Sequence, residues 1–140
     1  MTDVSLNIGS YLWASAYRLE RAKESLKEAN ILFERGHANT YVNRLYYACF
    51  YAVSAILLTR GLSSAKHSGI RSLFHQNFVK PGLVDTELGQ LYDRLFDNRQ
   101  KGDYADLVRF DPNEVSDWYD EAREFVETVQ NIVKKELDKH

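Results

Sequence analysis

The stretch "YVNRLYYACFYAVSAILL", residues 41–58, decides the fold of this chain. Apolar side chains fall on nearly every face of a helix formed here, so that helix must be surrounded by other elements. Its most apolar part, residues 46–58, is too short for an ordinary membrane span. We therefore expect a central helix over residues 41–60, capped by Asn39 or Thr40 and ended by Gly61.

Helical patterns also occupy the rest of the chain, where apolar residues recur every three or four positions. The expected helices cover residues 10–35, a shorter segment at 67–80, residues 85–100 and a last helix from about 113 to 137. Short links between long helices favour antiparallel neighbours. The sequence thus predicts an all-α fold: an up-and-down antiparallel helical bundle of four long helices plus one short helix, forming a single domain over residues 1–140.

Composition narrows the classes of function. The chain has 140 residues, of which 44% are hydrophobic, enough for one domain with a real core. The net charge of −2 excludes a broad basic surface for non-specific nucleic-acid binding. The single cysteine, Cys49, excludes an intrachain disulfide and fits a reducing cytoplasm, where we place the protein. The N-terminus lacks a secretion-signal pattern. The histidines have no metal-ligand spacing, so we expect no metal and no cofactor.

The first candidate for chemistry is Arg44, a full charge on the otherwise apolar helix. A lone charge in a core costs several kcal/mol, so Arg44 needs a partner. One interpretation is an ion pair with a carboxylate of the fourth or fifth helix. The other is a contact to a phosphate, for which the guanidinium fork is suited.

The second candidate is "SSAKHSG", residues 63–69, where Lys66 and His67 stand at an expected helix start. Backbone N–H groups and the helix dipole favour an anion there, so these side chains could hold a phosphate. Serine and histidine are also common helix caps, and the segment has too few glycines for a P-loop.

The third candidate is "NRQKGDY", residues 98–104, at the end of the fourth expected helix. A cation such as Arg99 is favourable at a helix C-terminus in any case, and Tyr104 could simply anchor the next loop. The functional interpretation brings Arg99, Lys101, Asp103 and Tyr104 together at the mouth of the bundle. The tyrosine could then bond a phosphate or stack on a base.

Three stretches in this order, "YVNRLYYACFYAVSAILL", "AKHSGIRSLFHQNFVK" and "LYDRLFDNRQKGDYAD", resemble the HEPN domain family (higher eukaryotes and prokaryotes nucleotide-binding) in its short, stand-alone UPF0332-type form. The resemblance covers nearly the whole chain. It implies a two-fold homodimer and a minimal nucleotidyltransferase partner that acts as antitoxin to a HEPN toxin.

Active members of that family are metal-independent ribonucleases that use an arginine, four to six variable residues and then a histidine. In such a site the arginine stabilises charge on the phosphorane and the histidine moves the 2′-hydroxyl proton. Arg99 matches the arginine, but Tyr104 stands where the histidine is expected. A tyrosine, with a pKa of about 10, is a poor base at neutral pH. His67 can replace the histidine only if the fold brings it close to Arg99.

Two functions therefore stay open. The first is a nucleotide- or RNA-binding HEPN protein of a toxin–antitoxin pair, with a cleft lined by Arg44, Lys66, His67, Lys101, Arg99, Asp103 and Tyr104. Whether it is also a ribonuclease depends on the missing base. The alternative is a non-catalytic helical module for interaction or dimerisation, in which these residues are ion pairs and caps.

Overall fold

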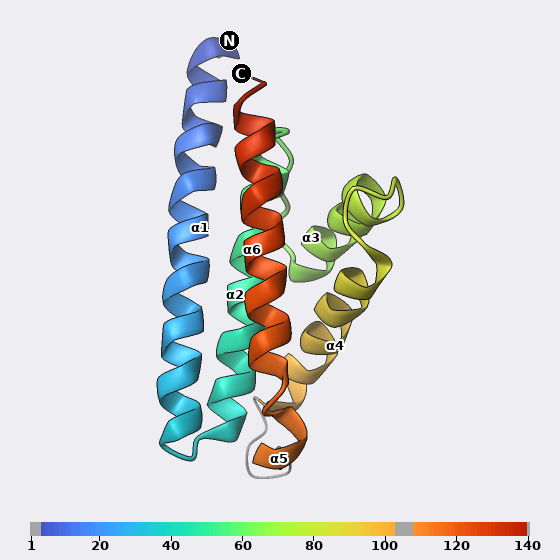
Figure 1. Ribbon diagram of the computed structural model, residues 1–140. Helices are drawn as coiled ribbons and strands as arrows, with labels where there is room; N and C mark the ends of the chain where they lie inside the picture. Colours follow the sequence, from blue (N-terminus) through green and yellow to red (C-terminus); the bar gives the residue numbers. More distant parts are fainter. Residues whose placement is uncertain (1–3, 103–107, 140) are drawn as a thin grey trace.

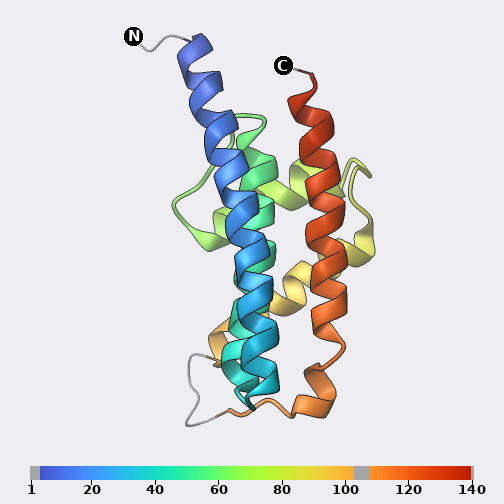
Figure 2. The same ribbon diagram turned by 60° about the vertical axis from the view of Figure 1, so that its left-hand side comes forward.

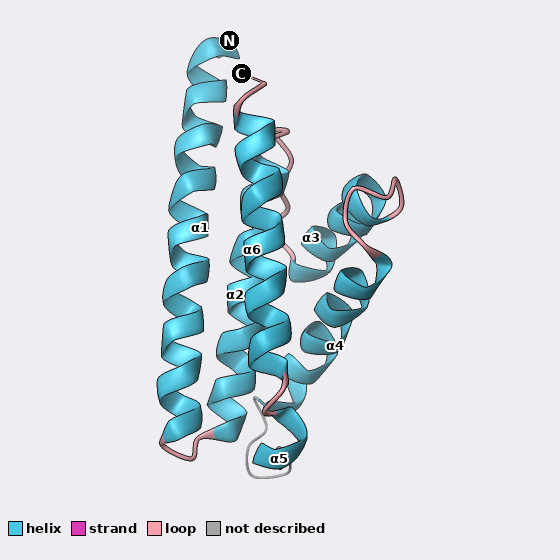
Figure 3. Cartoon of the chain, in the orientation of Figure 1, coloured by secondary structure: helices cyan, strands magenta, loops and turns pink. Residues whose placement is uncertain are grey.

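The computed structural model describes residues 4–102 and 108–139, and every regular element in these ranges is helical (Figure 3). In chain order the elements are α1 (Val4–Glu34), α2 (Ala38–Leu58), α3 (His67–Phe74), the π-helical segment η1 (His75–Val79), α4 (Thr86–Gly102), α5 (Pro112–Val115) and α6 (Trp118–Leu137). The expected all-α helical bundle is confirmed.

Three of the long helices, α1, α2 and α6, lie side by side along the long axis of the molecule (Figures 1 and 2). The chain descends through α1, rises through α2, descends through α4 and rises again through α6, so the up-and-down order is as expected. The helix α4 slopes away from the other three, and α3 lies across the space between α2 and α4 (Figure 1). The start of α3 and the last turn of α4 both approach α2, where His67 and Arg99 contact Tyr46.

The central position of α2 follows from its composition. Most of its side chains are buried, including Tyr41, Tyr46, Cys49, Ile56 and Leu57. The helix before it, α1, and α2 itself end close to where expected, because Gly36 and Gly61 adopt positive φ angles of 81° and 69°. Within the described ranges, no helix is both long enough and apolar enough to cross a membrane.

Two expected helix starts are wrong in detail. The helix α2 begins at Ala38 with no side-chain cap, and Asn39 instead bonds the chain that follows α4. Its Nδ2 donates to the carbonyl of Val108 at 2.8 Å, and its Oδ1 accepts from the Phe110 N–H at 2.9 Å. The last expected helix is split into α5 and α6, and Asp111 caps α5 by accepting from the Asn113 N–H.

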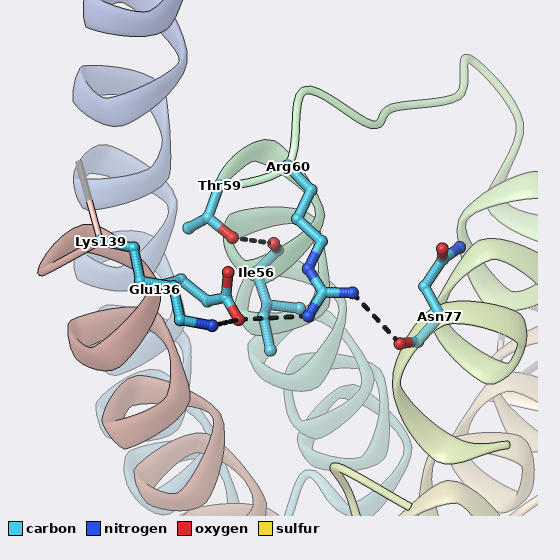
Figure 4. Close-up of polar contacts among 6 residues, drawn as sticks. All are labelled: Ile56, Thr59, Arg60, Asn77, Glu136 and Lys139. Atoms are coloured by element: carbon cyan, nitrogen blue, oxygen red, sulfur yellow. Dashed lines mark hydrogen bonds and ion pairs between the residues drawn. The ribbon is translucent and has the colours of Figure 1, made fainter. Parts of the chain in front are cut away.

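A polar cluster ties the upper ends of α2 and α6 to η1 (Figure 4). Arg60, just after α2, reaches Glu136 of α6 with a distance of 3.2 Å between Nη2 and Oε1, and its Nη1 donates to the Asn77 carbonyl at 3.4 Å. Lys139 lies 3.3 Å from the same Glu136 oxygen. The Arg60 guanidinium also covers the Phe78 ring at 4.4 Å. The Glu136 side chain is only 11% exposed, so its charge depends on these two cations.

We expect Arg60→Met to destabilise the fold by about 1–2 kcal/mol, because it removes a charged hydrogen bond from a mostly buried carboxylate. Burial raises the pKa of Glu136, but the hydrogen bonds from Arg60 and Lys139 outweigh it and hold that pKa below 4.5. A depressed carboxyl pKa stabilises the fold above the ordinary value, and this contribution is lost as the pH falls through the folded-state pKa. Urea unfolding of both proteins should therefore converge at acidic pH.

The control is Arg94→Met, which breaks the exposed Arg94–Glu121 pair at 3.0 Å. Surface pairs of this kind contribute little, so we expect a change below about 0.5 kcal/mol. Equal losses in the two variants would contradict a special role for the Arg60 cluster.

Candidate phosphate site at Arg99 and His67

The fold brings Arg99 and His67 together, although they are far apart in the sequence. His67 is the first residue of α3 and Arg99 lies in the last turn of α4. Arg99 Nη1 is 3.1 Å from His67 Nδ1. Both helices reach this point because α3 packs against the side of α2. The arginine and the imidazole thus meet over the middle of α2.

Aromatic residues of α2 hold the imidazole in place. The His67 ring stacks on Phe50 with a centroid distance of 4.3 Å and an angle of 11° between the planes. The Tyr46 hydroxyl lies 2.7 Å from His67 Nδ1. Tyr46 and Phe50 are one helical turn apart, so α2 offers both contacts from the same face.

Burial and a neighbouring positive charge keep the His67 ring neutral at neutral pH. Burial, and then the positive charge of Arg99, lower the pKa of His67 below 6.5. Burial also raises the pKa of Tyr46 to about 12, so its hydroxyl keeps its proton. Arg99 and Tyr46 are then both donors toward Nδ1, which assigns the acceptor role to Nδ1 and the ring proton to Nε2.

Arg99 has no counter-ion among the residues that the structure describes. Its guanidinium carbon lies 5.2 Å from the Tyr46 ring centre and 5.9 Å from that of Phe96, and its Nε is buried without a hydrogen-bond partner. A partly buried charge without a carboxylate is costly, and an anion would relieve that cost. This arrangement is chemically suited to a phosphate group.

Arg71, which was not a candidate from the sequence, also contacts Phe96. Its guanidinium covers that ring at 4.0 Å and reaches Asp97 at 3.6 Å and Asp93 at 3.9 Å. His75 also contacts Asp93, with Nε2 2.9 Å from Oδ1. These acids neutralise Arg71, whereas none reaches Arg99 in the described parts of the chain.

His67, Arg71 and His75 are spaced four residues apart in the sequence. Residues four apart lie on one face of a helix, so this spacing is the sequence pattern from which Arg71 and His75 could have been recognised as neighbours of His67.

The other candidate residues are not all brought together. Arg44 does not contact His67 directly, but both contact Tyr47. The Tyr47 ring centre is 4.9 Å from the Arg44 guanidinium and 5.9 Å from the centre of the His67 ring. Its carboxylate contact, at 4.0 Å, is Glu28 of α1, so the expectation of an acid from the fourth or fifth helix is wrong. The functional role of Arg44 stays a prediction.

The remaining candidates are less well placed or lie outside the description. Lys66 is exposed and directly precedes α3, with its backbone N–H donating to Ser64 Oγ at 3.2 Å. Lys101 belongs to α4, and its side chain is outside the described part. Asp103 and Tyr104 lie outside the described residues.

Gly69 allows the chain before α3 to pack closely on this helix. A Cβ on Gly69 would lie 2.8 Å from the Cβ of Ser64 and still closer to its hydroxyl. We expect Gly69→Ala to displace the Ser64 segment and the start of α3, at a cost of about 1–3 kcal/mol typical of overpacking. NMR of the His67 ring should show the displacement, and Ser68→Ala, at an exposed neighbouring position, should leave both stability and spectrum unchanged. An unaltered His67 signal in Gly69→Ala would contradict the expectation.

The all-helical bundle is the fold that the HEPN resemblance implied. The family model described as HEPN domain matches residues 15–132, a span that includes both His67 and Arg99. The chain therefore belongs to the HEPN domain family.

Curated relatives agree with this membership. The chain is 43% identical over 118 residues to a UPF0332 protein of Thermotoga maritima, covering 84% of this chain and 89% of the relative. It is 34% identical over 119 residues to a Methanocaldococcus jannaschii protein named "Putative toxin MJ0605", covering 85% and 88%. It is 30% identical over 118 residues to a UPF0332 protein of Archaeoglobus fulgidus, covering 84% and 94%.

Proposed function

We propose that this chain is the toxin of a toxin–antitoxin pair and that it binds and cleaves single-stranded RNA at the Arg99–His67 cluster. The observation that carries the proposal is the Arg99 guanidinium, which has no carboxylate partner in the described residues and lies 3.1 Å from a neutral imidazole. Family membership and the toxin name carried by one relative support it.

In this proposal Arg99 binds the scissile phosphate. Its charge is permanent, and its fork of donors matches two phosphate oxygens. When the 2′-oxygen attacks, negative charge builds on the phosphorane, and a donor already fixed beside it stabilises that charge more than the ground state. The surrounding rings of Tyr46 and Phe96 reduce competition from water.

In this proposal His67, and not Tyr104, is the general base. Once Arg99 turns to the phosphate and the Tyr46 hydroxyl rotates its proton away, Nδ1 of the neutral ring is free to accept the 2′-hydroxyl proton. The 2′-oxygen then bonds to phosphorus, the bond from phosphorus to the 5′-oxygen breaks, and the leaving oxygen takes a proton from water. The hydroxide that remains takes the proton from His67 and restores the neutral ring. The products are a 2′,3′-cyclic phosphate and a 5′-hydroxyl end, and no oxidant or metal enters this balance.

Family membership supports a proposal for the domain, the oligomeric state and the partner of this chain. We propose that residues 1–140 act as one domain, that two copies form a homodimer, and that a minimal nucleotidyltransferase is the antitoxin. Arg44, Lys66 and Lys101 would contact neighbouring phosphates, while Asp103 and Tyr104 would complete the mouth of the cleft. A cytoplasmic location would suit this role.

A second candidate is a non-catalytic interaction module, and one observation favours it. Trp13 and Tyr17 of α1 are 71% and 53% exposed and stack on each other with ring centres 5.7 Å apart. Exposed aromatic residues of this kind are enriched where proteins meet.

The test incubates the purified chain with single-stranded RNA in the presence of EDTA and analyses the new ends. Cleavage that leaves 2′,3′-cyclic phosphate supports the toxin nuclease. RNA that stays intact at all protein concentrations, with no binding, would leave the interaction module as the better account.

A further inference from the structure

We infer that a hollow beside Phe50 binds one base of the RNA strand and favours guanine. The inference rests on the proposed RNA-cleaving function and adds the base preference of the same site. The hollow measures about 100 Å³ and lies between α1, α2 and the start of α3. Pockets for drug-sized ligands are roughly 300–1,000 Å³, so this one admits only a fragment such as a single flat base.

The walls of the hollow are suited to a flat ring. Phe50, Leu58, Leu62 and Ile70 provide an aromatic and aliphatic surface. Single-stranded bases are commonly held by stacking on aromatic side chains, which gives affinity without hydrogen bonds.

Two polar groups in the hollow have no protein partner within the described residues. Ser54 is only 6% exposed, and no hydrogen bond is found for its hydroxyl. Arg18 of α1 lines the hollow and has neither an ion pair nor a hydrogen bond in the described parts of the chain. A hydroxyl that reaches the hollow unbonded, beside a guanidinium without a partner in the described residues, points to a ligand that supplies acceptors.

Guanine presents the acceptors that this pair requires. Its O6 and N7 accept two hydrogen bonds from one guanidinium, a pairing that adenine cannot make because it carries an amino group in place of O6. The Ser54 hydroxyl can donate to or accept from another position on the base edge. The chemistry therefore favours guanine over adenine.

The hollow and the phosphate site share one wall. Phe50 lines the hollow and also stacks on His67, which contacts Arg99. A base in the hollow would thus belong to the nucleotide whose phosphate, or whose neighbour's phosphate, is bound by Arg99. Ser64, which also lines the hollow, is held close by Gly69, so the loop and the start of α3 form both sites.

The experiment measures fluorescence anisotropy of labelled oligouridines that contain a single guanosine, a single adenosine or neither. The 2′-fluoro form of each is used, because it cannot be cleaved by 2′-oxygen attack. Salt is kept constant, since phosphate contacts depend on it. The proteins are wild type, Arg18→Gln and Ser54→Val, which replaces the hydroxyl in the hollow by a methyl group. The control is Arg35→Gln, which removes an exposed charge just past the end of α1.

We expect wild type and Arg35→Gln to bind the guanosine oligonucleotide at least about fivefold more tightly than they bind the adenosine oligonucleotide or plain oligouridine. Arg18→Gln and Ser54→Val should lose this preference and keep their affinity for oligouridine. Equal binding of all three oligonucleotides by wild type would overturn the base site. An equal loss of affinity for all three in Arg18→Gln would overturn it too, because Arg18 would then be a phosphate contact. Failure of wild type to bind any of them would overturn the proposed function itself.

Discussion

Replacing Arg99 by methionine is expected to reduce RNA cleavage by about 10²–10³-fold, because the transition state loses its main source of positive charge. Growth arrest on expression in cells should disappear with it. Methionine keeps the apolar contacts to Tyr46 and Phe96 but cannot pair with a phosphate. The measurement is the single-turnover rate of cleavage, compared with wild type at the same pH and salt.

The same variant should be at least as stable as wild type. Arg99 buries its Nε without a partner and has no carboxylate within the described residues, so an apolar side chain removes a cost and not a bond. Activity and stability should therefore change in opposite directions, which a purely structural arginine would not produce. Arg94→Met, one helix turn and a residue earlier on α4, is the control and should keep full activity. Retained cleavage in Arg99→Met, or its unfolding, would contradict the role proposed for Arg99.

The main features of the fold could be predicted because they depend on local patterns. The apolar run at residues 41–58 required a central helix, and Gly36 and Gly61 marked helix ends, since few other residues adopt a positive φ at low cost. The details that failed depend on contacts distant in sequence. Asn39 was expected to cap α2, but it bonds Val108 and Phe110, which no local pattern reveals.

The candidate site could be predicted only in part for the same reason. Arg99 and His67 were each recognisable from residue type and position near helix ends. Their contact depends on the slope of α4 and on α3 packing beside the middle of α2, both set by the shapes of buried side chains. Tyr46 and Tyr47 are adjacent on α2, and Tyr46 is buried while Tyr47 is half-buried. That the Tyr46 hydroxyl would reach His67 could not be inferred from spacing.

Replacing His67 by glutamine is expected to lower RNA cleavage by about 10²–10⁴-fold, the usual contribution of a general base. Glutamine retains a polar group near Arg99 and Tyr46 but cannot accept the 2′-hydroxyl proton at neutral pH. RNA binding should fall much less than cleavage, because Arg99 still binds the phosphate. His75→Gln, on the same helical stretch and paired with Asp93, is the matched control and should retain cleavage.

The pH dependence gives a sharper test of His67. Burial, and then the charge of Arg99, lower its pKa, so the neutral, basic form persists below pH 6.5 and cleavage should decline only at more acidic pH. Because the unfolded chain binds a proton at His67 more readily than the folded chain does, the fold also loses stability as the pH falls from the ordinary His67 pKa through the lowered one. In Arg99→Met one of the two causes is gone, so an NMR titration should find the His67 pKa closer to its ordinary value. A His67 pKa at or above the ordinary value in wild type, or one that Arg99→Met leaves unchanged, would show that the two side chains do not act as one site.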